Sequence, residues 1–429
     1  MQYLLSIIVF LLTSVLVADN QPAKVTIVEN DGYYQLLKDG TPYQIKGAGY
    51  EFNNLQSLKD HGGNSIRTWT TMGEGDKIKK LLDEAYQLGI SVSLCLPVTP
   101  SRWGFDYNDS EAVKKQYELM KSEVMKYRDH PALLTWIIGN ELNHSADSFA
   151  VYDAVDAMAR MIHELDPNHP VTTTLAGVDS EVLKQVLLRA PNLDFISFQV
   201  YGQMAILPDF IKENNYTGPF MVTEWGAIGY WEVEKTEWGA PIEMTSTQKA
   251  NNYLTGYNEK LSVLNNQLIG NYVFLWGQKQ ERTPTWFGLF SEHGLKTQAI
   301  DVMHYIWNEE WPDNRSPEVK LLTLNEQVAI DSINLTVGEQ YNAIVEANDY
   351  DKDKLTYQWE IKPESDSQKE GGDFEENIAS LRNLVISWEN NAATIKAPAT
   401  PGAYRLFVYV YDNNGNVGHA NVPFRVIAK

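Results

Sequence analysis

Two glutamates stand where apolar runs of the sequence end. Glu141 closes the run that begins at Trp136, and Glu224 closes the run that begins at Met221. Paired carboxyl groups can divide the work of a substitution, because a neutral acid protonates the leaving oxygen while a carboxylate attacks carbon. When glycoside cleavage retains configuration, two such groups lie about 5 to 5.5 Å apart. The pair therefore predicts double displacement at a sugar, provided that the fold brings both acids together.

The elements that must position this pair are short apolar runs separated by stretches of helical period. This alternation is typical of repeated βα units, and the active sites of barrels built from such units lie at the carboxyl ends of the strands. Eighty-three positions separate the glutamates, which corresponds to three βα units and places them after the fourth and seventh strands. The strands are expected near residues 44–49, 65–69, 91–96, 133–138, 171–175, 195–200, 219–223 and 271–276. The sequence thus predicts an α/β fold, a (β/α)8 TIM barrel.

The segments around both acids resemble the acid/base and nucleophile signatures of clan A glycoside hydrolases. The resemblance extends over residues 44–307 and rests on Gly139-Asn140-Glu141 and Thr223-Glu224-Trp225-Gly226. It implies that Glu141 is the acid/base and that Glu224 is the nucleophile. It also implies that Asn140 bonds the sugar 2-hydroxyl, Arg67 holds the nucleophile ionised, Tyr201 contacts it, and Trp276 forms the floor of the cleavage subsite. Each of these four has a structural alternative, namely a rim ion pair, rim packing or the tethering of a loop.

Further polar and aromatic residues are candidates for contact with substrate, because sugar C–H groups stack on aromatic rings. We expect Trp103 and Trp225 to bind substrate, while Gln278 and Arg282 can either reach substrate hydroxyls or hold a loop. The other aromatic candidates, for which core packing is the alternative, are Tyr50, Trp69, Trp231, Trp238 and Trp286.

No metal or cofactor is expected. Glu141 and His144 form half of a di-iron motif, but the sequence contains no second copy. The acidic run at residues 349–353 lacks the glycine and distal glutamate of an EF-hand loop, which favours a solvated turn. Cys95 is the only cysteine, so no intramolecular disulfide can form, and its apolar surroundings indicate core packing.

The composition changes near residue 316, after a linker with two prolines. Short alternating strands and turn residues follow, which predicts an all-β immunoglobulin-like sandwich. The expected domains are a signal peptide at residues 1–18, a barrel with an N-terminal hairpin at 19–315, and the sandwich at 316–429. Both acids belong to the barrel. We therefore expect the sandwich to supply no catalytic group, and a folded chain ending at Asn314 to keep most of its kcat on a short oligosaccharide.

Charge and the N-terminal segment bear on partners and location. The formal net charge of −21 repels nucleic acids and polyuronates, which favours a neutral β-glucan as partner and excludes nucleic acid. The apolar run before residue 18 reads as a cleaved signal peptide, with an uncleaved anchor as the alternative. We expect a secreted or periplasmic monomer with no membrane span after signal removal.

The substrate is predicted from a second resemblance. The segments at residues 43–50 and 63–69 resemble those of bacterial endo-β-1,3-glucanases, which also carry an immunoglobulin-like domain. This implies a retaining glycoside hydrolase that degrades polysaccharide, most specifically endo-β-1,3-glucan. The alternatives are a β-glucan transglycosylase, another clan A enzyme acting on galactosides, mannosides or glucuronides, and a non-catalytic glycan-binding protein.

Overall fold

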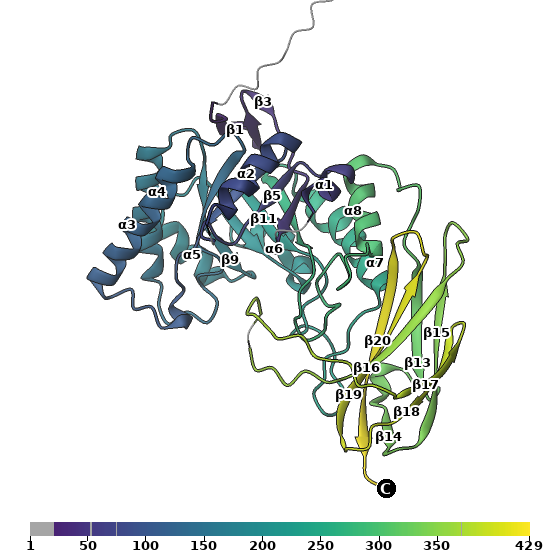
Figure 1. The fold of residues 1–429 in the computed structure, drawn as a ribbon. Coiled ribbons are helices and arrows are strands. Elements are labelled where there is room, and N and C mark those ends of the chain that lie inside the picture. The colour runs from purple at the N-terminus through teal and green to yellow at the C-terminus, as the bar shows by residue number, and fades with distance from the viewer. Residues whose placement is uncertain (1–20, 52–53, 74, 370) are drawn as a thin grey trace, which may run out of the picture.

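The protein is described by a computed structural model that covers residues 21–51, 54–73, 75–369 and 371–429. A barrel of strands and helices is followed by two packed β-sheets, and the two parts lie against each other (Figure 1). This confirms the expected class, a TIM barrel followed by a β-sandwich. The predicted signal peptide lies outside the described residues.

The barrel consists of parallel strands in the order of the chain. They are β4 (Gly47–Tyr50), β5 (Ser65–Arg67), β6 (Ser91–Leu96), β7 (Leu133–Ile138), β8 (Val171–Thr172), β9 (Thr174–Ala176), β10 (Ile196–Gln199), β11 (Phe220–Trp225) and β12 (Leu268–Trp276). The order in the sheet runs from β8 through β7 to β4, then from β12 to β9. Because only Thr173 separates β8 from β9, the two are halves of one fifth strand, and they close the ring of eight.

A helix follows each barrel strand, as the sequence period predicts. The helices are α1 (Leu55–Asp60), α2 (Lys77–Leu88), α3 (Ser110–Tyr127), α4 (Val151–Leu165), α5 (Ser180–Arg189), α6 (Leu207–Glu213), α7 (Ser246–Gly256) and α8 (Gln298–Asn308). Short helical turns are η1 (Ser101–Trp103), η2 (Gly202–Ile206), η3 (Tyr257–Leu261), η4 (Ser262–Leu264) and η5 (Ala329–Asp331). In α4 the residues Val151, Val155, Met158 and Ile162 are buried, at the three- and four-residue spacing of an amphipathic helix.

A small N-terminal sheet covers the amino ends of the barrel strands. It contains β1 (Val25–Asn30), β2 (Tyr33–Lys38) and β3 (Thr41–Pro42), paired antiparallel. Val25 and Leu36 pack with Leu134, Phe195 and Tyr272, which lie on or next to barrel strands. This end of the barrel is therefore closed by apolar packing, and the carboxyl end is left for a site.

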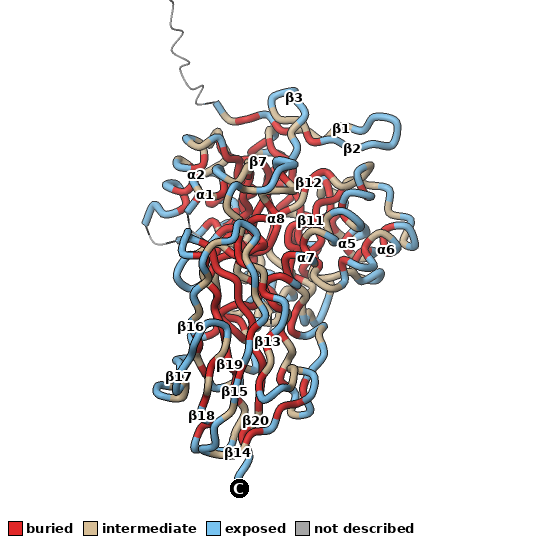
Figure 2. The backbone as a smooth tube through the Cα atoms, turned by 90° about the vertical axis from the view of Figure 1, so that its right-hand side faces the viewer, coloured by how far each residue is buried: buried red, intermediate tan, exposed pale blue. Residues whose placement is uncertain are grey.

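The C-terminal domain consists of two four-stranded sheets, ordered β13-β15-β18-β17 and β14-β20-β19-β16. Their bounds are β13 (Glu318–Leu324), β14 (Asn334–Thr336), β15 (Gln340–Asn348), β16 (Thr356–Pro363), β17 (Val385–Glu389), β18 (Ala392–Lys396), β19 (Gly402–Tyr411) and β20 (Val417–Ile427). Figure 2 shows buried residues along strands of the barrel and of the sandwich, and these residues form two separate apolar clusters. Each domain thus has its own core.

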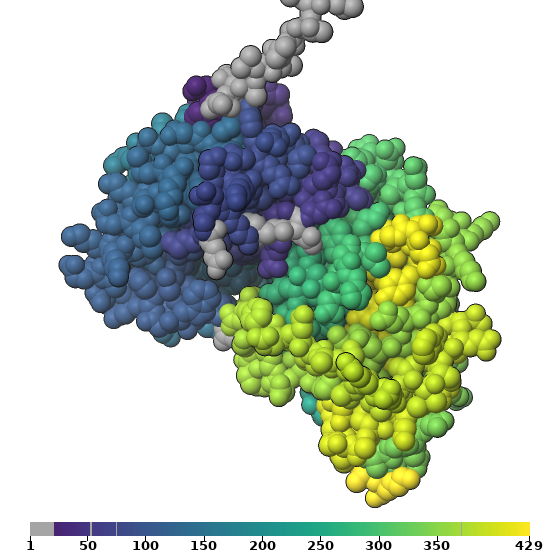
Figure 3. Space-filling model, in the orientation of Figure 1, coloured from purple at the N-terminus to yellow at the C-terminus, as the bar shows by residue number. Residues whose placement is uncertain are grey.

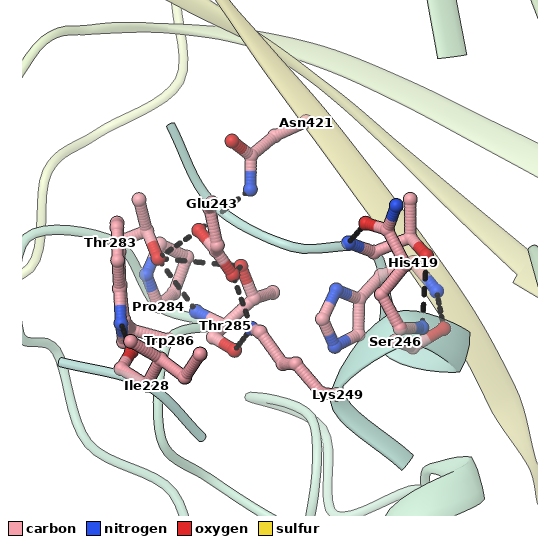
Figure 4. Close-up of polar contacts among 12 residues, drawn as sticks. Ile228, Glu243, Ser246, Lys249, Thr283, Pro284, Thr285, Trp286, His419 and Asn421 are labelled. Carbon is pink, nitrogen blue, oxygen red and sulfur yellow. Dashed lines mark hydrogen bonds and ion pairs between the residues drawn. The ribbon is translucent and has the colours of Figure 1, made fainter. Parts of the chain in front are cut away.

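A buried polar cluster joins the two domains. The carboxylate of Glu243 pairs with the Lys249 ammonium of α7 and accepts hydrogen bonds from Thr283, Thr285 and Asn421 (Figure 4). Asn421 belongs to β20 of the sandwich, whereas the other four residues belong to the barrel. The sandwich is therefore tied to the barrel loop between β11 and α7, which Thr283 and Thr285 link to the loop after β12.

Candidate active site

A large cleft opens at the carboxyl ends of the barrel strands. Its volume is about 880 Å³, within the usual range for ligand sites. The lining includes Glu141, which follows β7, and Glu224, which belongs to β11. Of the other predicted site residues, Asn140, Tyr201 and Trp103 also line this cleft.

Glu224 is held by three hydrogen-bond donors from the ends of two other strands, β5 and β10. Its Oε1 accepts from Arg67 Nη1 at 2.6 Å and from Trp69 Nε1 at 2.7 Å, and its Oε2 accepts from the Tyr201 hydroxyl at 2.7 Å. Both oxygens accept, as those of an ionised carboxylate do. Burial, followed by the charge of Glu224, raises the pKa of Tyr201, so its phenol remains a donor. The carboxylate is thereby fixed in one orientation at the cleft wall.

Arg67 also positions the amide next to the first glutamate. Its Nη2 donates to Asn140 Oδ1 at 2.8 Å, and Gln199 Nε2 donates to the same oxygen at 2.9 Å. Because Oδ1 is occupied by these donors, the Asn140 amide nitrogen is oriented away from them. The fully buried Arg67 therefore connects the two ends of the site, Glu224 and Asn140.

Glu141 occupies a strained backbone position at the end of the fourth strand. Its φ is 49°, in the left-handed region that non-glycine residues rarely adopt. The Glu141 amide donates to Thr174 Oγ1 at 3.0 Å, which ties the turn to the fifth strand. Gly139 has φ 73°, and a Cβ there would lie 2.6 Å from the Leu142 side chain. The turn thus requires glycine at position 139.

The surroundings of Glu141 favour its protonated form. Burial raises the pKa of Glu141 to about 8, and the negative charge of Glu224 acts in the same direction. Arg67 and Arg102 oppose the increase, whereas Glu281 adds to it. The cleft therefore contains one carboxyl group that keeps its proton near neutral pH and a second one whose two oxygens both accept hydrogen bonds.

Two predicted substrate contacts, Trp225 and Trp276, are wrong, because neither side chain lines the cleft. Trp225 directly follows Glu224, and adjacent strand residues point to opposite faces, so its buried ring packs on Tyr253 and its Nε1 donates to Asn271 Oδ1. Trp276 is fully buried against Trp307 of α8.

The orientation of Trp276 has a local cause in β12. Val273 pairs with Ala48 and Trp276 with Tyr50, so three steps along β12 match two along β4. The extra residue reverses the alternation of side chains, as a β-bulge does. Phe274 consequently lines the cleft in place of Trp276.

The remaining aromatic candidates divide between cleft and core. Trp69, Trp103 and Trp231 line the cleft, and Trp103 is 64% exposed. Tyr50 and Trp286 are buried in the barrel. Trp238 lies under Arg425 of the sandwich, with the guanidinium carbon 5.3 Å from the ring centroid.

Several cleft residues were not predicted from the sequence. After β12, Lys279 and Glu281 line the cleft, whereas Gln278 donates to the Pro284 carbonyl and Arg282 bonds the sandwich. The sequence indicated polar residues after the eighth strand, but it did not show which of their side chains face the cleft. Gln199 could have been noted from its place two residues before Tyr201.

Three further observations concern metal binding, membrane spans and the single cysteine. Within the described residues, no group of three or more His, Cys, Asp or Glu side chains is placed to hold a metal ion. No helix in the same part of the chain has the length and apolar character needed to cross a membrane. The Cys95 thiol is buried, which raises its pKa to about 11 and agrees with core packing.

Comparisons with known proteins agree with this barrel. Residues 76–274, which contain both glutamates, match the family model described as Glycosyl hydrolases family 2, TIM barrel domain. Mannan endo-1,4-beta-mannosidase F of Aspergillus clavatus is 30% identical over 112 residues, which cover 22% of this chain and 26% of that protein.

Solved structures with a similar fold include two β-glucuronidases. That of Bacteroides uniformis (β-glucuronidase 2) matches with a TM-score of 0.52 and 13% identity, over 94% of this chain and 48% of that one. That of Bifidobacterium dentium has a TM-score of 0.51 and 18% identity, over 67% and 50% of the respective chains. The chain thus spans about half the length of these structures and about a quarter of the mannosidase.

Together, these matches show that the barrel is similar to the TIM barrels of glycoside hydrolases, including β-glucuronidases. At such low identity the structural matches describe the fold alone. They do not reproduce the resemblance to endo-β-1,3-glucanases at residues 43–50 and 63–69.

Proposed function

We propose that the protein is a retaining β-glycosidase with Glu141 as acid/base and Glu224 as nucleophile. The observation that carries this proposal is the pairing in one cleft of a carboxyl group with a raised pKa and a carboxylate fixed by three donors. Double displacement needs this division between an acid and a nucleophile.

In the first step, Glu141 donates its proton to the glycosidic oxygen while Glu224 attacks the anomeric carbon. The C–O bond to the leaving group breaks and a glycosyl ester with Glu224 forms. Because the ester carries no charge, the electrostatic contribution of Glu224 to the pKa of Glu141 disappears at this stage. Glu141 is then suited to act as a base.

In the second step, Glu141 removes a proton from water, whose oxygen attacks the same carbon. The ester bond breaks, Glu224 returns to its carboxylate form, and two inversions give net retention. The Asn140 amide is positioned by Arg67 and Gln199 to bond the sugar 2-hydroxyl in both steps. A sugar hydroxyl in place of water would give transglycosylation.

The charges of the cleft favour a neutral sugar over a uronide. Among the described lining residues, the three side chains with Lys or Arg charge each have an internal partner. Arg102 pairs with Asp373 at 3.1 Å, Lys279 pairs with Glu281 at 2.8 Å, and the Lys369 ammonium donates to the Phe374 carbonyl. Binding a substrate carboxylate would require one of these interactions to be exchanged. We therefore propose a neutral sugar as substrate rather than a glucuronide, the substrate class in the names of the similar β-glucuronidases.

We propose endo-β-1,3-glucan as the first substrate to test, because of the sequence resemblance at residues 43–50 and 63–69. A β-mannan is the second, since the mannosidase match covers part of the chain. Product profiling on laminarin, mixed-linkage glucan, mannan and chromogenic glycosides, including glucuronides, distinguishes these substrates. Products longer than the substrate would indicate transglycosylation.

Azide rescue of two alanine variants tests the roles of the glutamates. Glu224→Ala should abolish turnover, and azide should restore part of it with a glycosyl azide of inverted configuration, because the anion occupies the vacated nucleophile side. Glu141→Ala should give an azide of retained configuration, because azide attacks the glycosyl-enzyme. Near wild-type turnover of an unactivated substrate by either variant would contradict the assignment.

A further inference from the structure

One segment of the sandwich extends away from its own domain to the catalytic cleft. It joins β16 to β17 and is described at residues 364–369 and 371–384; we refer to these residues as the strap. In the ribbon and space-filling views, this yellow-green segment reaches the face of the barrel (Figures 1 and 3). Lys369, Gly371 and Gly372 of the strap are among the residues that line the cleft.

The strap is attached to barrel loops on two sides. Arg102, after the third strand, forms a two-pronged ion pair with Asp373, with Nη2–Oδ1 and Nη1–Oδ2 distances of 3.1 and 3.4 Å. After the eighth strand, the Arg282 amide donates to Glu375 Oε2 at 3.0 Å, and its guanidinium donates to the Ser367 carbonyl. The strap therefore spans from the third to the eighth strand end at the mouth of the barrel.

Between these attachments, the strap backbone approaches cleft side chains closely. A Cβ on Gly371 would lie 3.3 Å from the Trp231 ring. The Gly372 amide donates to Glu281 Oε1 at 3.3 Å, and its carbonyl accepts from Lys279 Nζ at 3.5 Å. An aromatic ring, a carboxylate and an ammonium group thus border one part of the cleft, with the two glycines as its outer wall.

This part of the cleft lies one aromatic ring away from the nucleophile. Trp231 meets Tyr201 edge to face with ring centroids 5.7 Å apart, and Tyr201 donates to Glu224. Trp231 is 47% exposed, which leaves ring surface available to a ligand. An apolar ring flanked by polar groups matches the surface of a pyranose, which has C–H faces and hydroxyl edges.

We propose that the strap completes a sugar subsite next to the cleavage position, formed by Trp231, Lys279, Glu281 and the backbone at Gly371 and Gly372. The proposal rests on the proposed function and deepens it. The ligand of this subsite is a further neutral sugar unit of the same β-linked chain. The sandwich thereby determines specificity for substrates with more than one sugar unit, although both acids belong to the barrel.

The test is to fill the subsite from the strap side. Gly371→Phe places a ring against Trp231, and Gln368→Phe, at an exposed strap residue outside the cleft lining, is the matched control. The readout is the ratio of kcat/KM on a tetrasaccharide to kcat/KM on an aryl monoglycoside of the same sugar. This ratio should fall about tenfold or more in Gly371→Phe and stay at the wild-type value in Gln368→Phe. An unchanged ratio in Gly371→Phe would overturn the proposal.

A binding experiment separates this inference from the proposed chemistry. In a Glu224→Gln background, the affinities for laminaritetraose, cellotetraose and mannotetraose are measured by titration calorimetry. At least one should bind, about tenfold more weakly in Gly371→Phe and in Trp231→Ala than in Gln368→Phe. Trp231→Ala covers the case in which Gly371→Phe does not fold. Equal affinities, or no binding of any tetrasaccharide, would reject the subsite, whereas a failed azide rescue would reject only the catalytic roles.

Discussion

At the residue scale, the site depends on side chains that fix Glu224 from different strand ends. Arg67 and Trp69 follow the second strand, Tyr201 follows the sixth, and Glu224 is on the seventh. Hydrogen bonds to a charged group are worth about 1.5 to 3 kcal/mol each, more than neutral ones. The orientation of the Glu224 carboxylate is therefore determined by long-range contacts rather than by its own strand.

Loss of the tyrosine hydroxyl tests this fixation. Tyr201→Phe removes one donor to Glu224 Oε2, and kcat should fall by about 10- to 100-fold, as the loss of a charged hydrogen bond implies. The control is Tyr216→Phe, whose hydroxyl donates to the Pro219 carbonyl before β11. Steady-state kinetics on an aryl glycoside measure kcat for both variants. An equal loss of kcat in the two variants would contradict the role of Tyr201.

The pH dependence follows from the raised pKa of Glu141. In the proposed mechanism protonated Glu141 is the acid, so kcat/KM should fall as pH rises through its pKa, near 8. The Arg102 charge lowers this pKa and the Glu281 charge raises it. Arg102→Met should therefore move the basic limb to higher pH, and Glu281→Gln should move it to lower pH. Profiles that shift in the same direction for both variants would show that another group controls the limb.

At the scale of elements, irregularities decide which residues face the cleft. The extra residue in β12 turns Trp276 to the helices and leaves Phe274 at the site. The fifth strand is divided at Thr173, whose hydroxyl donates to the Ile138 carbonyl on the fourth strand. The adjacent Thr174 holds the Glu141 turn. Each irregularity lies next to a residue of the proposed site, where bulges and breaks are common.

The buried ion pair at the start of α7 should matter for stability. Lys249→Met leaves the Glu243 carboxylate buried without its cation, which should cost about 3 to 5 kcal/mol. Lys79→Met, which breaks an exposed pair with Asp83 on α2, should cost no more than about 0.5 kcal/mol. Chemical denaturation gives both values. Similar losses in the free energy of unfolding for both variants would show that the buried polar cluster at Glu243 relaxes or admits water.

At the scale of the whole molecule, the two domains share both an interface and a cleft. Besides the cluster at Glu243, the Arg405 guanidinium of β19 donates to the Pro241 carbonyl at 2.8 Å, and the His419 amide donates to Ser246 Oγ at 2.9 Å. Arg405, His419 and Ser246 are buried at this contact. The expectation that the barrel keeps its kcat without the sandwich stays a prediction, and these contacts add the expectation that the sandwich stabilises the barrel.

Truncation measures this dependence. A chain that ends at Asn314 loses the partners of Pro241, Ser246 and Glu243 as well as the strap. Its Tm should be about 10 °C lower than that of the full chain, because several buried hydrogen bonds of about 1 kcal/mol each are lost. Scanning calorimetry measures the Tm of both chains, and the soluble fraction of each chain on expression is compared. A truncated barrel with the Tm and tetrasaccharide kinetics of the full chain would contradict the shared cleft.

The sequence by itself determined the repeated βα units, the two-domain order and the acid pair. These depend on local periodicity and on residues at strand ends, and β6 (Ser91–Leu96) and β7 (Leu133–Ile138) match the expected bounds. Only the tertiary structure decided that Phe274 rather than Trp276 faces the cleft, that Lys279 and Glu281 line it, and that the strap closes part of it. The reason is physical: a bulge reverses side-chain direction without changing composition, and a contact between segments about 90 residues apart leaves no local pattern.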